Sequence, residues 1–546
     1  MSYDYVIVGA GSAGCVLANR LSEDATSRVL LLEAGPADTY PWIHIPIGYG
    51  KTMFHPVLNW GFQSEPEPQL NGRTMYTPRG RTLGGSSAIN GLIQIRGQAE
   101  DFDHWEELGA EGWNAQETLR YFIKSERNTR GAGAYHGGGG PLHVSDIGQK
   151  HELAEAFIAA AGELGIPRTD DFNGASQEGA GYLQLTTRNG FRCSAAVAYL
   201  RPARHRPNLR VITGAHVLRI VFEGRRAVGV EYRKDGQAVL VRAQREVVLS
   251  AGAVQSPQLL QLSGIGPAAL LSAMGIPVLN DLPGVGEGLQ DHLALRFIFK
   301  CAKPITTNDA LRSALAKMQT GLRYALFRTG PMAIGVMIAS LITRVMPGAT
   351  SPDMQLFLST VSADDRGMKP HQFSGFTVAY YPLRPSSRGS IHIKSPDPMT
   401  PPAIAYNYLS TNYDRAITVA GARLVRRLAA AHPLARYIVE EYRPGFAAES
   451  DADILAAVRE AGTTGYHPVG TCRMGRDEGS VVDPRLRVRG VSNLRVVDAS
   501  VMPTLVSGNT NAGTIMIAEK AADMIREDAL GAARLDAPRT VAMTTA

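Results

Sequence analysis

Cysteine is scarce in this chain: four copies occur among 546 residues. Cys15, Cys193, Cys301 and Cys472 lie far apart and form no C-x-x-C pair. Disulfide frameworks and cysteine zinc sites need paired or closely spaced cysteines, so the pattern argues against both and favours a reducing compartment. We therefore expect no metal site and a cytoplasmic location.

Long apolar runs are also missing. No stretch reaches the roughly 18 uncharged apolar residues of a membrane-spanning helix, and no basic segment followed by an apolar one opens the chain, so no secretory signal is expected. The nearest candidate for membrane contact is the segment 332–343, bounded by Arg328 and Arg344. We expect a buried core segment or a lid there, with peripheral contact at the inner face of a membrane as the alternative.

Runs of one charge are absent as well. The net charge is +6, but Lys and Arg are scattered along the chain. A scattered basic surface argues against a nucleic-acid partner. The composition, 44% hydrophobic and 19% charged, is that of a globular protein. A chain of this length predicts two or more compact units.

A glycine-spaced turn stands near the first residue. The apolar run Tyr5–Val8 predicts a buried strand, and G-x-G-x-x-G spacing follows it at Gly9, Gly11 and Gly14. The first glycine permits a tight turn, the second lets the backbone approach a pyrophosphate, and the third lets helix and strand pack closely. Glu33 ends the next predicted strand, about 20 residues on, where an acid accepts hydrogen bonds from a ribose. The turn predicts an adenine dinucleotide and leaves NAD, NADP and FAD open.

Patterns further along the chain predict two kinds of sheet. Buried strands are predicted at 209–212, 227–232, 245–252 and 494–498, helices at 101–127, 151–164, 412–460 and 511–525, and antiparallel strands at 376–380 and 390–393. The expected fold class is α/β, with a discontinuous Rossmann-like cofactor-binding domain and an antiparallel-sheet (α+β) substrate domain. The expected bounds are 1–150, 205–295 and 467–530 for the first domain, 151–204 and 296–466 for the second, and 531–546 for a flexible tail. The glycine-rich stretch Gly131–Gly140 is expected to be a surface linker.

Five further segments make the opening turn more specific. They are rich in small or hydrogen-bonding residues beside predicted strands and helices: Gly80–Asn90, Gly252–Gly266, Tyr466–Gly475, Asp498–Ser500 and Asn509–Thr514. With them the chain resembles the glucose-methanol-choline (GMC) oxidoreductases, FAD-dependent enzymes that oxidise alcohols. The resemblance spans roughly residues 3–526, departs from the family pattern at Gln94, and is nearest to bacterial choline-dehydrogenase-like and alkanol-dehydrogenase-like members.

The resemblance implies FAD and the residues that surround it. The pyrophosphate would lie against Gly9, Gly11, Ser12, Ala13 and Gly14. The adenosine end would meet Glu33, Ala34, Val217, Ala251 and Gly252. The ring and its ribityl chain would meet Trp60, Gly84, Ser87, Asn90, Gly91, Leu92, Ile93, Asp498, Ala499, Asn509 and Thr510. Some members tether FAD through a histidine at the position that Ile89 occupies, so non-covalent FAD is expected.

Two residues are implied in the chemistry. Alcohol oxidation removes a hydroxyl proton and transfers a hydride to flavin N5, so the protein must supply a base. His467 fits that role, because imidazole titrates near neutral pH, and Asn511 would donate a hydrogen bond to the substrate oxygen. His292 is expected to be structural, in an Asp–His pair that knits a loop, and Gly288 stands where the family usually has asparagine.

Three functions remain open on the sequence. The first is an alcohol dehydrogenase that oxidises an alcohol, expected to be primary, to an aldehyde and passes electrons to a quinone or other carrier. The second is an oxidase of the same fold that uses O₂ and makes H₂O₂, and the third is a non-redox flavoprotein such as a hydroxynitrile lyase. Gly465 favours the dehydrogenase, because some oxidases of the family carry a branched apolar residue there. Apolar segments favour a substrate with an apolar or aromatic body, with choline and polyols as alternatives.

Overall fold

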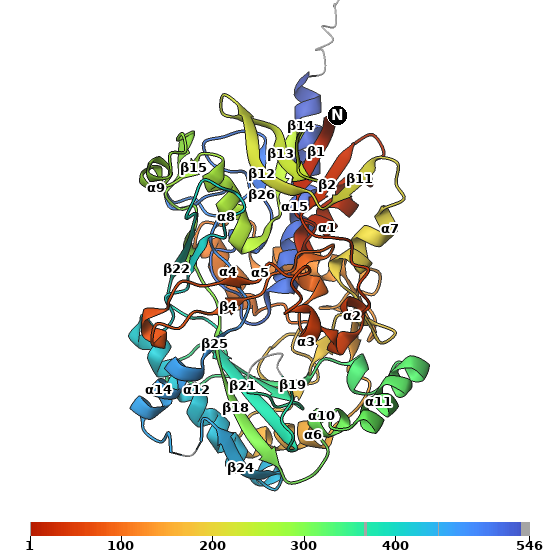
Figure 1. Cartoon of the computed structure of the whole chain (residues 1–546), viewed down its shortest axis with the longest axis vertical. Coiled ribbons are helices and arrows are strands. Elements are labelled where there is room, and N and C mark those ends of the chain that lie inside the picture. Colours follow the sequence, from red (N-terminus) through yellow and green to blue (C-terminus); the bar gives the residue numbers. More distant parts are fainter. Residues whose placement is uncertain (1, 365–368, 446, 537–546) are drawn as a thin grey trace, which may run out of the picture.

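The computed structural model describes residues 2–364, 369–445 and 447–536. Two large sheets occupy opposite ends of the long axis, and helices and loops connect them (Figure 1). The chain passes between the two ends repeatedly, so each sheet takes strands from distant parts of the sequence.

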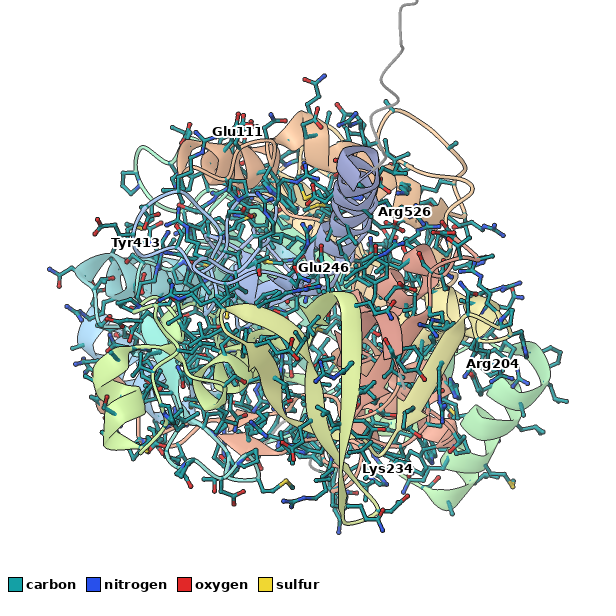
Figure 2. The ribbon with its side chains drawn as sticks, turned by 90° about the horizontal axis from the view of Figure 1, so that it is seen from above. Glu111, Arg204, Lys234, Glu246, Tyr413 and Arg526 are labelled. Atoms are coloured by element: carbon teal, nitrogen blue, oxygen red, sulfur yellow. The ribbon has the colours of Figure 1, made fainter. Side chains whose placement is uncertain are left out.

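The first sheet has seven strands in the order β11-β2-β1-β14-β13-β12, with β26 also paired to β14. Their bounds are β1 Ser2–Val8, β2 Val29–Glu33, β11 Leu209–Thr213, β12 His216–Glu223, β13 Arg226–Lys234, β14 Gln237–Leu249 and β26 Leu494–Val496. The strands β1, β2, β11 and β26 run parallel to their neighbours. The strand β2 and the second half of β1 are apolar runs because they are buried inside the sheet. The β13–β14 hairpin extends this sheet, and Lys234 marks its turn in Figure 2.

Helices α1 (Ser12–Leu21) and α5 (Ala115–Ser125) both pack against α15 (Thr510–Asp536) beside this sheet. Arg20 of α1 and Glu519 of α15 form an ion pair at 2.8 Å, which joins residues almost 500 positions apart. The single helix predicted at 101–127 is two helices, α4 (Ala99–Glu107) and α5, and Asn114 caps the second by accepting from the Glu117 N–H. Residues 531–536 of the predicted tail belong to α15, and 537–546 lie outside the described residues.

The second sheet is antiparallel, in the order β24-β18-β21-β20-β19-β7, with β25 also paired to β18. Its bounds are β7 Gly179–Tyr182, β18 Leu293–Cys301, β19 Met337–Thr343, β20 Met354–Ser359, β21 Gly375–Pro382, β24 Ile438–Arg443 and β25 Thr463–Thr464. Helices α6 (Glu152–Glu163) and α12 (Asn412–Ala430) pack against it, and α13 (His432–Ala435) and α14 (Asp451–Ala461) join α12. The predicted helical region 412–460 is therefore interrupted by β24.

The segment 332–343 is mostly a buried strand. Residues 337–343 form β19, which pairs with β20 on one side and β7 on the other, and Ile338 to Thr343 are buried. A short apolar run fits a strand or a buried helix equally well by periodicity. The core alternative is thus confirmed for these residues, and they are neither a lid nor a membrane-docking segment.

The remaining elements are short or connect the two ends. They are α2 Pro41–His44, α3 Tyr49–Thr52, β3 Phe62–Gln63, β4 Tyr76–Thr77, β5 Glu126–Asn128, β6 Leu142–Asp146, β8 Gln184–Leu185, β9 Thr187–Arg188, β10 Phe191–Arg192, α7 Arg201–Ala203, α8 Gly252–Leu262, β15 Ile265–Gly266, α9 Ala268–Ala273, β16 Asn280–Asp281, β17 Glu287–Leu289, α10 Thr307–Ala310, α11 Ala314–Phe327, β22 Gly389–His392 and β23 Ala403–Ala405, with the helical turns η1 Pro46–Gly48, η2 Pro68–Leu70, η3 Gly85–Ala88, η4 Ala196–Leu200, η5 Pro331–Ala333 and η6 Ala499–Val501.

Two apolar cores correspond to the two sheets. One surrounds β1, β2 and β14, and the other surrounds β18, β20 and β21. Residues between Cys193 and Ala203 pack into the first core, although the predicted bounds put them in the second domain. The division of the chain into two domains stays a prediction, and its boundary near 204 does not follow the cores.

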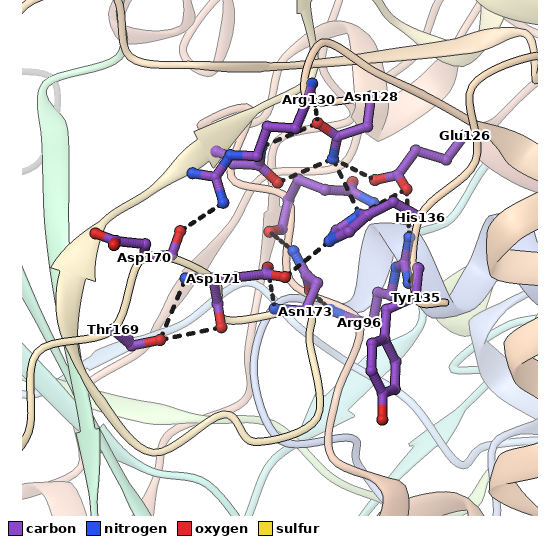
Figure 3. Close-up of polar contacts among 12 residues, drawn as sticks. Arg96, Glu126, Asn128, Arg130, Tyr135, His136, Thr169, Asp170, Asp171 and Asn173 are labelled. Atoms are coloured by element: carbon purple, nitrogen blue, oxygen red, sulfur yellow. Dashed lines mark hydrogen bonds and ion pairs between the residues drawn. The ribbon is translucent and has the colours of Figure 1, made fainter. Parts of the chain in front are cut away.

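The glycine-rich stretch is tied to the body of the protein. His136 lies between Glu126 and Asp171, at 3.0 and 2.8 Å, and Glu126 also pairs with Arg96 at 2.5 Å (Figure 3). A side chain at Gly137 would meet the Ile123 carbonyl oxygen at 2.0 Å, so the backbone approaches α5 as only glycine can. The stretch is an anchored loop and not a linker.

Candidate active site

A cavity of about 380 Å³ lies between the two sheets. Residues from the ends of β1, β2 and β14 line one part of it, and side chains of β18, β20 and β21 line the other. Every residue implied in binding FAD or in catalysis lines this cavity, except Gly14, Gly84 and Ser87. The structure thus brings together positions from 9 to 511.

The turn Gly9–Gly14 forms one end of the cavity. Gly9 has φ +95°, and a side chain there would meet the Ser250 carbonyl oxygen at 2.6 Å. A side chain at Gly14 would meet the Gly9 carbonyl oxygen at 1.9 Å, so this glycine permits the contact between helix and strand and does not line the cavity. Gly11 caps α1 without a side-chain hydrogen bond, so first-turn N–H groups remain for an anion.

Glu33 lies at the end of β2 and is 5% exposed. Its two carboxyl oxygens accept from the Gly35 and Ala10 N–H groups, both at 2.9 Å. Burial raises the pKa of Glu33 to about 7. Ala34, Val217, Ala251 and Gly252 line the same region. A carboxyl group oriented in this way can accept hydrogen bonds from ribose hydroxyls with its remaining lone pairs.

Hydrogen bonds to the glycine turn and to Ala195 fix the loop 84–93. The Gly84 N–H donates to the Ala10 carbonyl oxygen at 2.8 Å. The Ser87 hydroxyl donates to the Gly84 carbonyl oxygen at 2.6 Å and accepts from the Ala195 N–H. Gly84 and Ser87 therefore shape the loop, while Trp60, Asn90, Gly91, Leu92 and Ile93 line the cavity.

The chain after β26 contributes the opposite wall. Asp498 is buried and accepts from the Gly252 N–H at 2.8 Å and the Ser256 hydroxyl at 2.6 Å, so it joins β26 to the start of α8. Burial raises its pKa. Ala499, Asn509 and Thr510 also line the cavity.

Three buried polar atoms of the cavity wall have no hydrogen-bond partner within the described chain. They are the Ser250 hydroxyl oxygen, His216 Nδ1 and Asn509 Oδ1. Buried polar groups are nearly always hydrogen-bonded, so unpartnered atoms around one cavity indicate a polar ligand. The glycine turn, the buried Glu33 and these atoms together fit FAD.

A chain of hydrogen bonds fixes His467. His292 Nε2 lies 3.0 Å from the Leu383 carbonyl oxygen, which only accepts, so His292 carries its proton on Nε2. Burial lowers the pKa of His292 to about 3, so it is neutral and its Nδ1 accepts. His292 Nδ1 is 2.9 Å from His467 Nδ1, which must therefore donate. In neutral His467 the lone pair is then on Nε2, at the cavity wall.

Asn509 contacts the ring of His467. Asn509 Nδ2 lies 2.9 Å from His467 Nε2, and its orientation is consistent with an N–H that donates to that nitrogen. Asn511 Oδ1 accepts from the Ser12 hydroxyl at 2.7 Å, beside the glycine turn. Asn511 lies in the first turn of α15 and also lines the cavity, and its hydrogen bond to the substrate oxygen stays a prediction.

Asp291 and His292 do not pair with each other as the sequence led us to expect. Asp291 is buried and accepts from the His467 main-chain N–H at 2.6 Å, the Tyr408 hydroxyl at 2.5 Å and the Thr464 hydroxyl. The two neighbours therefore hold the backbone and the ring of His467 respectively. Sequence reasoning missed this role of His292, because the contact joins positions 175 residues apart.

We call the part of the cavity beyond His467 the distal cavity. It is lined mainly by apolar and small side chains of the second sheet and the segment before β19: Ala294, Arg296, Val336, Met337, Phe357, Ser359, Val361, Ala363, Thr377, Ala379, Tyr381 and Gly465. Arg296 donates to the Asp364 carbonyl oxygen at 2.6 Å. Among the described residues, no carboxylate lines the distal cavity. These residues were not predicted, because alternate positions on separate strands carry no local motif.

Comparisons with known proteins match this geometry. Two GMC oxidoreductase family models match residues 3–294 and 385–518. The chain is 46% identical to the mitochondrial choline dehydrogenase of Mus musculus, over 96% of this chain and 89% of that protein. It is also 46% identical to the alcohol dehydrogenase [acceptor] of Pseudomonas putida, over 96% and 95%. Pyridoxine 4-oxidase from Mesorbium loti has a similar structure, with a TM-score of 0.88, 33% identity, and coverage of 96% and 99%.

The cavity, its glycine turn and these matches agree. The chain belongs to the GMC oxidoreductases and is an FAD-dependent oxidoreductase that acts on CH–OH donors.

Proposed function

We propose that this enzyme oxidises a primary alcohol with an apolar or aromatic body to the aldehyde, and that His467 is the base. The observation that carries the proposal is the hydrogen-bond chain from Leu383 through His292 to His467, which leaves the lone pair of His467 on Nε2. A base oriented before the substrate arrives contributes about 10²–10⁴-fold to the rate.

The residues around His467 have separate tasks. His467 Nε2 accepts the hydroxyl proton, and the Asn509 amide donates a hydrogen bond to the substrate oxygen as the charge on it grows. FAD, when bound, supplies the acceptor for the hydride from the same carbon. Asn511 lines the same cavity, and its Oδ1 accepts from the Ser12 hydroxyl beside the glycine turn.

The distal cavity supports an uncharged substrate body. A quaternary ammonium ion such as choline favours an aromatic cage with an anion nearby. Phe357 and Tyr381 are present, but the described residues of the distal cavity include Arg296 and no carboxylate. The similarity to choline dehydrogenases does not by itself make choline the substrate, because no described carboxylate stands beside these aromatic side chains.

We further propose a quinone or another carrier as the electron acceptor, with O₂ as the alternative. Residue 465 has no room for a side chain. A Cβ there would lie 2.9 Å from both the Cβ and the carbonyl oxygen of His292. The branched residue found there in some oxidases would displace the ring that positions His467. The oxidases among the similar structures keep the O₂ alternative in the test.

A panel of alcohols tests the substrate and the acceptor together. Benzyl alcohol, a medium-chain alkanol, a polyol and choline are each assayed with a dye acceptor and with O₂, by dye reduction and by peroxide formation. We expect the first two to be turned over fastest, with the dye faster than O₂. Choline as the best substrate, or peroxide at the dye-linked rate, would contradict the proposal.

Variants test the assignment of His467 and the two asparagines. His467→Ala should keep its flavin and lose about 10²-fold or more of kcat. Asn509→Ala should lose turnover while it keeps FAD, whereas Asn511→Ala, its matched control two residues away, should weaken FAD binding more than turnover of the loaded enzyme. Flavin absorbance and dye-linked rates measure both effects. The reverse result for the two asparagines would assign the hydrogen bond to the substrate oxygen to Asn511.

A further inference from the structure

Helix α11 exposes a row of large apolar side chains. Leu315, Met318, Leu322 and Leu326 are spaced by three or four residues, and their exposed fractions are 59, 64, 57 and 64%. Residues at this spacing share one face of a helix. Phe327, which ends the helix, is 69% exposed. Isolated exposed leucines are ordinary, but five large apolar residues gathered on one short helix are not.

The opposite face of α11 holds the helix to the protein. Tyr324 lies half a turn away from Leu322 and is buried, and its hydroxyl donates to the Gly190 carbonyl oxygen at 3.0 Å. The helix also packs against α10 and η5 and stands at the edge of the molecule in Figure 1. The apolar row therefore points away from the body, and we call it, with Phe327, the α11 face.

Cations flank the α11 face. The segment 310–330 contains Arg312, Lys317, Arg323 and Arg328 and no acidic residue. Arg312 pairs with Asp309, while Lys317 and Arg323 are exposed on the helix itself. An apolar stripe bordered by Lys and Arg is the pattern of helices that lie in the interface of an anionic bilayer. A partner protein with an acidic and apolar surface is the alternative. The basic residues around the α11 face favour an anionic lipid surface over it, because such a surface carries negative charge throughout.

The α11 face is also continuous with the cavity wall. The chain passes from α11 through η5 to Val336 and Met337, which line the distal cavity. The turn η5 packs against η1, next to Tyr49 at the same cavity. The end of α11 at Phe327 is thus nine residues along the chain from Val336, the first of these cavity residues. No helix among the described residues is long and apolar enough to cross a membrane.

We propose that the α11 face docks the enzyme onto an anionic phospholipid surface. The apolar row enters the boundary between headgroups and acyl chains, and Lys317 and Arg323 contact lipid phosphates. The inference deepens the proposed use of apolar alcohols and a lipid-soluble acceptor, which a bilayer would concentrate beside the distal cavity. Docking itself does not depend on turnover, so it is measured independently.

The experiment is co-sedimentation of the purified holoenzyme with vesicles. Vesicles of phosphatidylcholine with one third phosphatidylglycerol are compared with vesicles of phosphatidylcholine alone, at low and high salt. We expect binding to the anionic vesicles that weakens with salt. The double variant Leu322→Glu/Leu326→Glu should lose about tenfold or more of the partition coefficient. The double variant Lys317→Gln/Arg323→Gln should lose about fivefold for each cation, only on the anionic vesicles.

A matched control separates the α11 face from exposed apolar residues in general. Leu240, 52% exposed on β14, and Val439, 65% exposed on β24, are replaced by glutamate in a second double variant, which should bind as the wild type does. Flavin content and dye-linked oxidation of a water-soluble alcohol should be unchanged in all variants, so lost binding with normal activity supports docking alone. Absence of wild-type binding, or equal losses in the two glutamate variants, would overturn the proposal. So would a wild-type dimer, seen by light scattering, that the α11 variant dissociates, because the face would then join two copies.

Discussion

At the scale of single residues, the proposed base, His467, is oriented by the residues that it contacts. The Leu383 carbonyl oxygen can only accept, and this one fact determines the proton positions on His292 and then on His467. His292 also stacks on Tyr381, with ring centroids 4.2 Å apart, which limits its rotation. A residue that was expected to be structural thus becomes a positioning residue for the base.

Removal of the acceptor on His292 should reduce the rate without removing the base. In His292→Leu the Nδ1 of His467 loses its partner and the ring can adopt other orientations, so we expect kcat to fall about 10–100-fold with little change in KM or flavin content. His292→Gln, which has both an acceptor and a donor, should recover part of the loss. Steady-state kinetics with a dye acceptor measure this, and a His292→Leu enzyme with wild-type kcat would remove the positioning role.

At the scale of elements, an irregular loop is held as firmly as a helix. The loop that contains Gly131–Gly140 is joined to 169–173 and to Arg96 through His136, Glu126 and Asp171 (Figure 3). The two carboxylates raise the pKa of His136 to about 9, and the pKa values of Glu126 and Asp171 are lowered, although burial alone would raise them. The glycine content of this loop predicted a linker, because composition indicates a flexible backbone but not the distant residues with which the loop pairs.

The loop should make stability depend on pH. The folded pKa of His136 is raised above its ordinary value of 6.5, so its stabilisation is complete below that value and is lost as pH rises through about 9. The pKa values of Glu126 and Asp171 are lowered, so the stabilisation that these carboxylates contribute is lost as the pH falls and they become protonated. His136→Gln should therefore lower the free energy of unfolding by about 1 kcal/mol at pH 6, and by less near pH 9.

Urea denaturation at both pH values measures that difference. The matched control is His104→Gln, because His104 pairs with Glu107 at 3.0 Å but is half exposed. It should change stability little at either pH, since exposed pairs contribute little. A His136→Gln effect that is the same at the two pH values would contradict the assigned pairing.

At the scale of the whole molecule, FAD would bridge two separate cores. Its cavity is lined by the first sheet at one end and the second sheet at the other. Because a ligand bound only to the folded state stabilises it, FAD at about 100 times its Kd should add about 2.7 kcal/mol. We expect acid-released apoenzyme to melt at a lower temperature and FAD to restore the original Tm. Calorimetry tests this, and identical Tm values for both forms would contradict the bridging role.

The sequence was sufficient for features that recur locally and insufficient for those that depend on long-range contact. The strand ending at Val8, the turn after it and the strand near 496 were predicted, because apolar runs and glycine spacing are local signals. The FAD-lining positions followed from the family resemblance, and most of them line one cavity. Three features could not be predicted in this way: the contact of Asn509 with His467, the strand β19 and the exposed α11 face. Each depends on whether residues distant in the sequence pack against it, and a short stretch of sequence does not contain that information.

One such contact has a consequence for how the enzyme is made. The Ser12 hydroxyl meets Asn511, and Arg20 meets Glu519, so the glycine turn is completed by α15, which is translated about 500 residues later. The first 500 residues can leave the ribosome with the glycine turn formed and one wall of its pocket still missing. We therefore expect FAD to be loaded only after α15 has been made, and a chain cut before residue 509 to lack flavin even where its first sheet has folded.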